Sequence, residues 1–269
     1  MADNLNENRD IDLAQATVIA TGTLRKNGES YSVIRLEEKH IPQMAALHDR
    51  VYNDLAPSDK TFMLHKDTAY FTRHFAQSHT GIGIVHNGKL VAHGLLHLPT
   101  KQYPNTEMGD FKKKIKPQDI AVMLNLQVHP DSRGHSLMSI VISSLMNQAQ
   151  KRGRKHLLSE VDVRNTASWY SFMKEGLKIH SIGDDPRDGA VLYNMHAKTK
   201  PLMKHRLSKT FNAMAAKKNA DIPQNEITRQ RGLLKKGWHG VSYNTKQNTL
   251  GFRRPNLARR VINTFKRTG

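Results

Sequence analysis

The segment from residue 128 to residue 138 has the clearest chemical meaning in this sequence. An apolar run ends at Val128, Pro130 prevents a strand from continuing, and Arg133 and Gly134 precede a second apolar run with helical spacing. A helix that starts here would present free backbone N–H groups and the positive end of its dipole, which suits a phosphate or pyrophosphate. The same strand–turn–helix arrangement is common without any ligand, so the segment alone leaves both interpretations open.

Other patterns of phosphate binding and catalysis do not occur in the sequence. The segment lacks the Lys-Ser or Lys-Thr pair of a phosphate loop, and Gly81-Ile82-Gly83 leads to His86 where a dinucleotide-binding turn needs a third Gly. The Gly-x-Ser-x-Gly nucleophile elbow of serine hydrolases is also missing. His93 and His97 would share one face of a strand, but no third ligand accompanies them, so we expect no metal site.

Two carboxylates with strand spacing are candidates for proton transfer. Glu160 and Asp162 lie two residues apart in an apolar run, so they share one face of the strand expected there. Such a pair could take a proton from a substrate through water. The alternative is structural, because Arg154 and Arg164 are close enough in the sequence to form ion pairs with them.

The elements expected around these residues form a mixed α/β domain. Alternating apolar residues predict strands, and apolar residues at three- and four-residue spacing predict helices. Asn87-Gly88 between two apolar runs is a strong hairpin signal. The expected strands cover residues 31–36, 81–85, 89–97, 120–128, 156–163, 177–182 and 190–196, and the expected helices cover residues 38–55, 67–76, 134–152 and 165–176.

Composition excludes several classes of protein. Of the 269 residues, 38% are hydrophobic, which is enough for one core. The chain has no Cys, which excludes disulfide scaffolds, thiolate nucleophiles and Cys-ligated zinc. Its apolar runs are far shorter than the ~18 residues that span a bilayer, and its polar, acidic N-terminus lacks the pattern of a secretory signal. We therefore expect a soluble, cytoplasmic protein.

Positive charge is concentrated in the last quarter of the chain. The 42 Lys and Arg outnumber the 23 Asp and Glu, and residues 200–269 hold 17 of the basic but only two of the acidic side chains. Charge asymmetry of this kind is typical of an appendage. The sequence therefore predicts a polar N-terminal extension (1–28), a globular domain (29–199) and a basic C-terminal tail (200–269), in which the strand patterns weaken.

The basic tail suits an acidic partner. Apolar residues at helical spacing within 203–214 and 257–265 predict basic amphipathic helices, which bind anionic membranes or acidic proteins. Aromatic residues among the charges would also suit nucleic-acid stacking. The alternative is a solvated extension that folds back on the domain.

Two segments, in order, resemble one known family. Residues 128–138 (VHPDSRGHSLM) resemble motif A of the GNAT family of N-acetyltransferases, and residues 165–177 (NTASWYSFMKEGL) resemble its motif B. The element order from residue 31 to residue 197 also fits, so the resemblance covers about 165 residues and leaves out the tail. It implies a GNAT-like α/β fold, with a mixed sheet flanked by helices, and an acetyl-CoA site.

The resemblance implies which residues would bind acetyl-CoA. The family's pyrophosphate loop maps onto residues 133–138, where backbone N–H groups would hold the diphosphate, and Ser136 and Met138 replace two Gly-type positions of that loop. Asn165 matches an Asn that hydrogen-bonds the pantetheine arm, although a helix N-cap is an equal alternative. The implied cofactor-binding set is Leu126, Gln127, Val128, Arg133, Gly134, His135, Ser136, Leu137, Met138, Asn165 and Phe172.

The family's proton-transfer residues have weaker counterparts in this chain. The Tyr that often protonates the departing thiolate is replaced by Phe172, which cannot donate a proton. Tyr170 is two residues earlier and faces about 200° away on a helix. The candidate catalytic residues are therefore Glu160, Asp162 and Tyr170, and positioning of a neutral amine on the thioester can supply much of the rate.

The sequence predicts an N-acyltransferase that transfers an acetyl group from acetyl-CoA to a primary amine of a protein, peptide or small molecule. The alternative is a catalytically weak or inactive GNAT-fold module that acts through a tail binding RNA, an anionic membrane or an acidic protein. Basic C-termini also resemble the signals of some secreted bacterial effectors, which would change the expected location.

Overall fold

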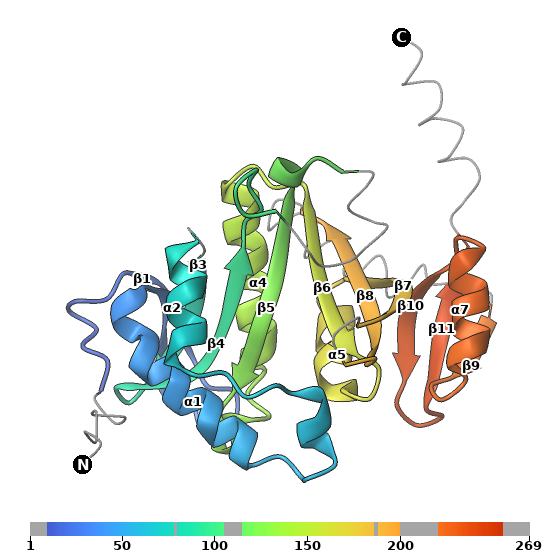
Figure 1. Cartoon of the computed structure of the whole chain (residues 1–269). Coiled ribbons are helices and arrows are strands. Elements are labelled where there is room, and N and C mark those ends of the chain that lie inside the picture. The colour runs from blue at the N-terminus through green and yellow to red at the C-terminus, as the bar shows by residue number, and fades with distance from the viewer. Residues whose placement is uncertain (1–9, 78–79, 105–114, 186–187, 200–219, 255–269) are drawn as a thin grey trace. The chain divides into compact units, whose positions relative to one another are not determined.

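The computed structural model is a mixed α/β protein with helices flanking its strands (Figure 1). The structure describes residues 10–77, 80–104, 115–185, 188–199 and 220–254. These form two compact units, and the boundary between them falls inside strand β6 (His156–Asp162). Unit 1 runs to residue 159 and also takes in residues 198 and 199, and the remaining described residues form unit 2.

Unit 1 is built on a sheet whose strands neighbour one another in chain order. Its antiparallel strands are β1 (Val18–Thr23), β2 (Ser30–Leu36), β3 (Thr80–His86), β4 (Lys89–His97) and β5 (Ile120–Val128). The start of β6 joins β5 in parallel, from Ile120 opposite His156 to Val122 opposite Leu158. The hairpin between β3 and β4 turns on Asn87 and Gly88, whose φ angles of 48° and 74° fit an Asn-Gly turn.

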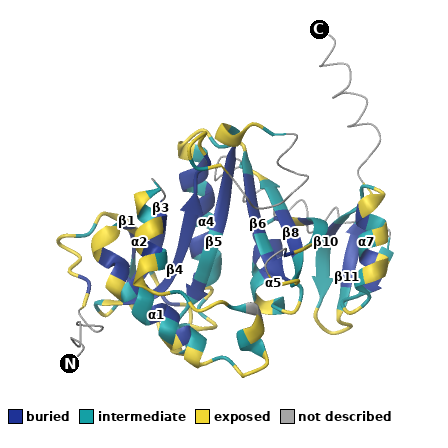
Figure 2. Ribbon diagram, in the orientation of Figure 1, coloured by how far each residue is buried: buried dark blue, intermediate teal, exposed yellow. Residues whose placement is uncertain are grey.

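Helices cover both faces of this sheet. Helices α1 (Ile41–Asn53) and α2 (Thr68–Ala76) lie on one face and α4 (Leu137–Lys151) on the other (Figure 1). Neighbouring residues of β4 show the two layers: Leu95 packs into the cluster that holds α1 and α2, whereas a Cβ at Gly94 would lie 2.7 Å from Val141 Cγ1 of α4. Figure 2 shows the buried strands between the helices.

Short 3₁₀ turns connect the longer elements of unit 1. They are η1 (Glu38–His40), η2 (Asp59–Phe62), η3 (Pro117–Asp119) and η4 (Pro130–Ser132). Helix α1 begins with Ile41 and Pro42, and Pro suits a first helical position because its fixed φ is already helical. None of the described helices is long and apolar enough to cross a membrane.

In its described residues, unit 2 has the strand order β6-β8-β7-β10-β11-β9 and two helices. Its elements are α5 (Thr166–Lys174), β7 (Lys178–Asp184), β8 (Val191–Lys198), β9 (Ala220–Pro223), α7 (Ile227–Lys235), β10 (His239–Asn244) and β11 (Thr249–Arg253). The pairs β7–β8, β7–β10, β10–β11 and β11–β9 are all antiparallel.

The structure confirms the expected strands and helices between residues 31 and 198, and it corrects both ends. Residues 18–23, expected within the polar extension 1–28, form strand β1. Residues 220–254, expected within the basic tail 200–269, form three strands and a helix. These elements escaped prediction because they are short and bury few apolar side chains; β9, for example, buries only Ile222. The amphipathic segments expected within 203–214 and 257–265 lie outside the described residues.

Candidate cofactor site

A β-bulge near the end of β5 shapes the approach to the loop at residues 129–136. His93 of β4 pairs with Gln127, but Leu95 pairs with Leu124, so β5 has one extra residue between these pairs. Asn125 lies in this bulge with a φ of 48°. Gly94, opposite, has no room for a side chain, because a Cβ there would lie 2.9 Å from Leu126 Cγ. The bulge therefore takes backbone groups of Asn125 and Leu126 out of the regular β4–β5 ladder.

The loop after β5 leads directly into the N-terminus of α4, as the sequence predicted. The 3₁₀ turn η4 is followed by Gly134 at φ 84° and by Ser136 at φ 63° and ψ 20°. Ser136 is the N-cap of α4, yet among the described residues its side chain accepts no hydrogen bond from the helix backbone. The start of this 15-residue helix thus keeps N–H donors without the side-chain cap that usually satisfies them.

A lysine from a distant turn lies against the same loop. Lys26, between β1 and β2, donates from Nζ to the backbone oxygen of Arg133 at 3.3 Å, and its backbone N–H donates to His135 Nδ1 at 3.4 Å. Arg133 itself is ion-paired, with Nη1 2.7 Å from Oδ2 of Asp54 at the end of α1. Sequence reasoning missed Lys26, because 107 residues separate it from Arg133 and its turn carries no motif.

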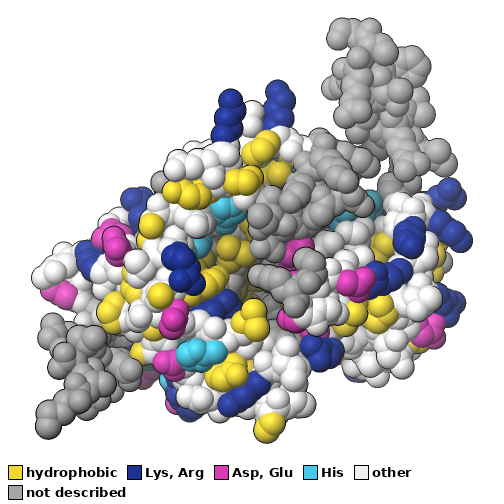
Figure 3. Space-filling model, in the orientation of Figure 1, with side chains coloured by type: hydrophobic (Ala, Val, Ile, Leu, Met, Phe, Trp, Pro, Cys, Tyr) yellow, Lys and Arg dark blue, Asp and Glu magenta, His cyan; other side chains and the backbone are white. Residues whose placement is uncertain are grey.

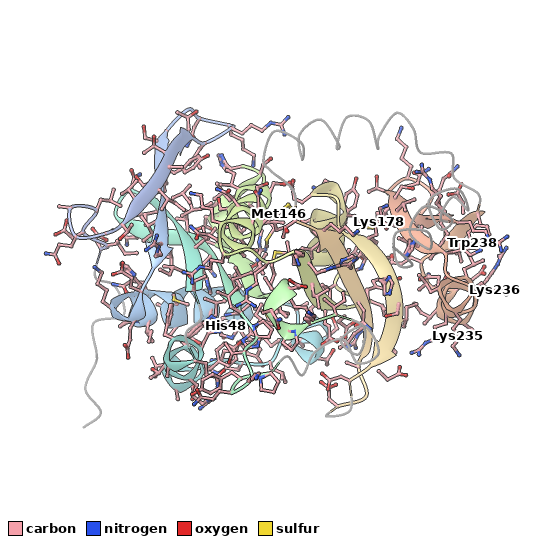
Figure 4. The ribbon with its side chains drawn as sticks, turned by 90° about the horizontal axis from the view of Figure 1, so that it is seen from above. His48, Met146, Lys178, Lys235, Lys236 and Trp238 are labelled. Carbon is pink, nitrogen blue, oxygen red and sulfur yellow. The ribbon has the colours of Figure 1, made fainter. Side chains whose placement is uncertain are left out.

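Buried histidines surround the side chain of Gln127. Its amide lies 2.5 Å from His48 Nδ1 of α1 and 3.3 Å from His93 Nε2 of β4. Burial lowers the pKa of His48 to about 4 and that of His93 to about 3, so both rings are neutral at pH 7. The Lys66 N–H donates to His48 Nε2 at 2.9 Å, so both ring nitrogens of His48 have a polar neighbour. His48 is labelled in Figure 4. Gln127 therefore offers a cofactor only its backbone.

In unit 2, the segment resembling motif B forms α5. Asn165 is its N-cap, and Asn165 Oδ1 accepts a hydrogen bond from the Ser168 N–H at 3.1 Å. This confirms the N-cap interpretation of Asn165. Trp169 is fully buried and donates from Nε1 to the Val163 carbonyl oxygen at 3.1 Å, which fixes the turn before the helix.

A family model described as acetyltransferase (GNAT) family matches residues 44–176. These residues belong to the GNAT family. The structure has the fold class expected from the resemblance, a mixed sheet flanked by helices. The match covers residues 128–138 and all but the last residue of the segment 165–177. A comparison with curated proteins found no match.

Solved GNAT structures are similar to the chain at low sequence identity. The ribosomal-protein-S18-alanine N-acetyltransferase from Escherichia coli is 17% identical, with 64% of this chain and 95% of that chain covered and a TM-score of 0.48. A putative acetyltransferase from Salmonella typhimurium, solved with acetyl-CoA, is 13% identical, with coverages of 64% and 95% and a TM-score of 0.47. N-acetylglutamate synthase from Neisseria gonorrhoeae, solved with coenzyme A and N-acetyl-glutamate, is 16% identical, with coverages of 64% and 35% and a TM-score of 0.44.

Within the GNAT domain, the catalytic candidate Asp162 and the cofactor-binding candidate Phe172 both have structural roles. Asp162 is ion-paired with Arg164, with Oδ2 2.7 Å from Nη2 and Oδ1 2.9 Å from Nε. This is the structural alternative considered for Asp162. Phe172 is 2% exposed and packs in the core of unit 2. Tyr170 is half-buried, and Lys174 Nζ lies 4.9 Å from its ring centroid.

The predicted site residues divide between the two units. Unit 1 holds residues 126–128, at the end of β5, and residues 133–138, in the loop and helix start that follow. Unit 2 holds Glu160, Asp162, Asn165, Tyr170 and Phe172. Glu160 is half-buried on β6, two residues before Asp162. In the described ranges, no group of three or more His, Asp or Glu side chains could hold a metal ion.

Proposed function

We propose that the chain is an N-acyltransferase that uses acetyl-CoA and acetylates a primary amine of a protein, peptide or small molecule. The observation that supports this best is the start of α4 in the family-matched region. There, Gly134 and Ser136 adopt left-handed conformations and the helix lacks a side-chain cap among the described residues. Uncapped N–H groups and the helix dipole suit a diphosphate.

The residues of this loop fit the diphosphate of acetyl-CoA. Arg133 is held by Asp54, so the phosphate contacts would come from backbone N–H groups, as in the family's motif. Lys26 Nζ brings a positive charge to the same loop, which favours an anion there. Ser136 keeps a backbone conformation that glycine adopts readily, so its presence at a Gly-type position leaves the shape of the loop intact.

The chemistry needs few residues of the chain. When bound, acetyl-CoA supplies an activated acyl thioester. Asp162 is engaged by Arg164, and Glu160, two residues earlier on β6, is the candidate to take a proton from the amine through water. Phe172 cannot donate a proton to the departing thiolate, so that proton would come from water or from the amine itself. Orientation of the amine would then carry much of the rate.

Thermal unfolding of the full chain with acetyl-CoA tests the proposal. Binding to the folded state alone raises the melting temperature with ligand concentration. We expect a rise with acetyl-CoA, together with release of free CoA thiol when an amine panel of peptides and polyamines is added. Glu160→Gln should lower the rate of thiol release without lowering acetyl-CoA binding. No thermal shift, together with no thiol release, would refute the proposal.

A second candidate is a non-catalytic GNAT module that binds an acidic polymer such as RNA. The buried Phe172 and the ion-paired Asp162 favour it, because both weaken proton transfer. Lys and Arg side chains gather over α7 (Figure 3), and Lys235 and Lys236 are exposed at its end (Figure 4). RNA binding that falls steeply with salt, and that Lys235→Glu with Lys236→Glu abolishes, would support this candidate.

A further inference from the structure

Two segments of unit 2 have the same local structure, and we name them the first copy (residues 160–197) and the second copy (residues 220–254). Their helices, α5 and α7, each have nine residues. The N-cap residues Asn165 and Glu226 have φ and ψ of −80° and 68°, and of −83° and 59°. Both helices end at a left-handed glycine, Gly176 at φ 92° and Gly237 at φ 80°.

The strands of the two copies are also equivalent. In the first copy, β7 and β8 pair with a bulge between Ile179 and Ser181, and in the second copy β10 and β11 pair with a bulge between Gly240 and Ser242. The strand order β6-β8-β7 of the first copy is mirrored by β10-β11-β9. Ile179 pairs with Gly240, its own equivalent, so a local two-fold axis passes between β7 and β10.

In both copies, a side chain of the helix donates a hydrogen bond to a backbone carbonyl oxygen of the turn before that helix. Trp169 of α5 donates from its ring nitrogen to the carbonyl oxygen of Val163, two residues before the N-cap. Gln230 of α7, at the equivalent position, donates from Nε2 to the carbonyl oxygen of Gln224 at 2.9 Å. Gln230 is fully buried, and it is oriented by the first copy, because Tyr193 donates from its hydroxyl to Gln230 Oε1 at 2.8 Å.

The second copy in turn holds the turn before α5 in the first copy. Gln224 donates from Nε2 to the Val163 carbonyl oxygen at 3.1 Å and to Thr166 Oγ1 at 2.9 Å, on either side of Asn165. The ring of Tyr243 packs edge-on against Trp169, with centroids 4.8 Å apart. The Val163 carbonyl thus accepts one hydrogen bond from each copy.

We propose that the second copy is a positioning element for residues 163–166, and that Gln224 is its positioning residue. This inference rests on the proposed function, together with the contact between Asn165 and the pantetheine arm that the family resemblance implies. A side-chain amide that bridges Val163 and Thr166 restricts the turn that carries Asn165. Loss of the bridge leaves the fold in place but lets this turn leave its binding conformation, so the cost appears in cofactor affinity.

Calorimetry of the full chain with coenzyme A tests the proposal. In Gln224→Glu the side chain keeps its size but presents an acceptor to the Val163 carbonyl, and in Gln224→Ala both hydrogen bonds are lost. We expect the Kd for coenzyme A to rise about tenfold in each variant. The KM for acetyl-CoA should rise in parallel, while kcat at saturation stays near that of the unaltered chain. Amide hydrogen exchange at residues 163–168 should become faster.

The matched control is Gln247→Ala, which removes an exposed glutamine from the same copy. In the structure this side chain accepts a hydrogen bond from Asn244, not from the first copy. We expect its Kd for coenzyme A to match that of the unaltered chain. If Gln224→Glu lowers the melting temperature but leaves the Kd within twofold, the second copy is only a structural support and the proposal is wrong. If the unaltered chain does not bind coenzyme A, the proposed function fails and this inference fails with it.

Discussion

Ile179 of β7 and Gly240 of β10 face each other at equivalent positions of the two copies in unit 2. A Cβ at Gly240 would lie 3.0 Å from Ile179 Cβ and 3.1 Å from Ile179 Cδ1. The glycine is therefore required by close approach of the strands across the local two-fold axis. Two identical copies would place the same residue at both positions. Here the second copy has a glycine where the first has an isoleucine, and the missing side chain makes room for Ile179.

Replacing Gly240 with a larger residue should weaken the packing of β10 against β7 and so destabilise the chain. We expect Gly240→Val to lower the free energy of unfolding by about 1–3 kcal/mol, because the added side chain overpacks against Ile179. Chemical denaturation measures the change, and a double-mutant cycle with Ile179→Ala should recover part of the loss. Gly232→Ala is the matched control: nothing lies within 4 Å of that helical position, so it should raise stability by up to about 1 kcal/mol. Additive effects in the cycle would contradict the contact.

The left-handed conformation of Ser136 should make it a point of strain. A non-glycine residue in this region costs about 1–2 kcal/mol, so we expect Ser136→Gly to stabilise the chain by roughly 0.5–1 kcal/mol. Ser136→Val should destabilise it, because a β-branched residue tolerates this φ poorly. Ser144→Gly, inside α4, should have the opposite sign to Ser136→Gly. Equal effects at positions 136 and 144 would show that the conformation of Ser136 is unstrained.

The position of Lys26 predicts an electrostatic effect on coenzyme A binding. Reversing its charge in Lys26→Glu places a carboxylate beside the backbone of Arg133 and Gly134, where the diphosphate is proposed to bind. We expect a loss of affinity of about tenfold or more that shrinks as salt is added. Arg25→Glu makes the same change in net charge in the same exposed turn and is the control. An equal loss in both variants would point to the overall charge rather than to Lys26.

The sequence predicted those elements of the fold whose hydrophobic periodicity or turn residues give a clear local signal. The Asn87-Gly88 turn, the strand before Val128 and the helix after Ser136 follow from local periodicity and turn chemistry. The repeat in unit 2 had no such signal. Over residues 160–184 and 221–245 only Lys174, Gly176 and Ser181 have identical equivalents. What the copies share is backbone geometry, which many different side chains can satisfy.

The candidate site was predicted where backbone chemistry decides it. The loop at residues 133–138 depends on backbone N–H groups at the start of a helix. Its resemblance to motif A could therefore be recognised although Ser136 replaces a Gly-type position. Side-chain roles were less predictable. The alternation of β5 sends Gln127 toward the buried His48, which no local spacing reveals. Lys26 and Gln224 contact partners that are 107 and 61 residues away in the sequence, so only the tertiary structure identifies them.

The buried histidines predict a fall in stability at mildly acidic pH. In the unfolded chain a histidine titrates near 6.5, whereas in the folded chain the pKa of His48 is about 4 and that of His93 about 3. Between these values the unfolded state binds more protons, so stability is highest above pH 6.5 and is lost as the pH falls. Each ring contributes up to about 1.4 kcal/mol per pH unit in this window.

Denaturation at a series of pH values from 7.5 to about 4.5 checks this prediction, since it spans the titration of an ordinary histidine. His74 and His239, whose pKa values burial lowers to about 3 and about 4, add to the slope of the unaltered chain. His93→Gln should therefore reduce the change in the free energy of unfolding per pH unit by the contribution of one histidine ring. It should also lower the free energy of unfolding at pH 7.5. His135→Gln, whose ring lies in the loop outside this network, is the control. A slope unchanged by His93→Gln would mean that this ring titrates alike in the folded and unfolded chains, and the neutral His48–Gln127–His93 arrangement would be wrong.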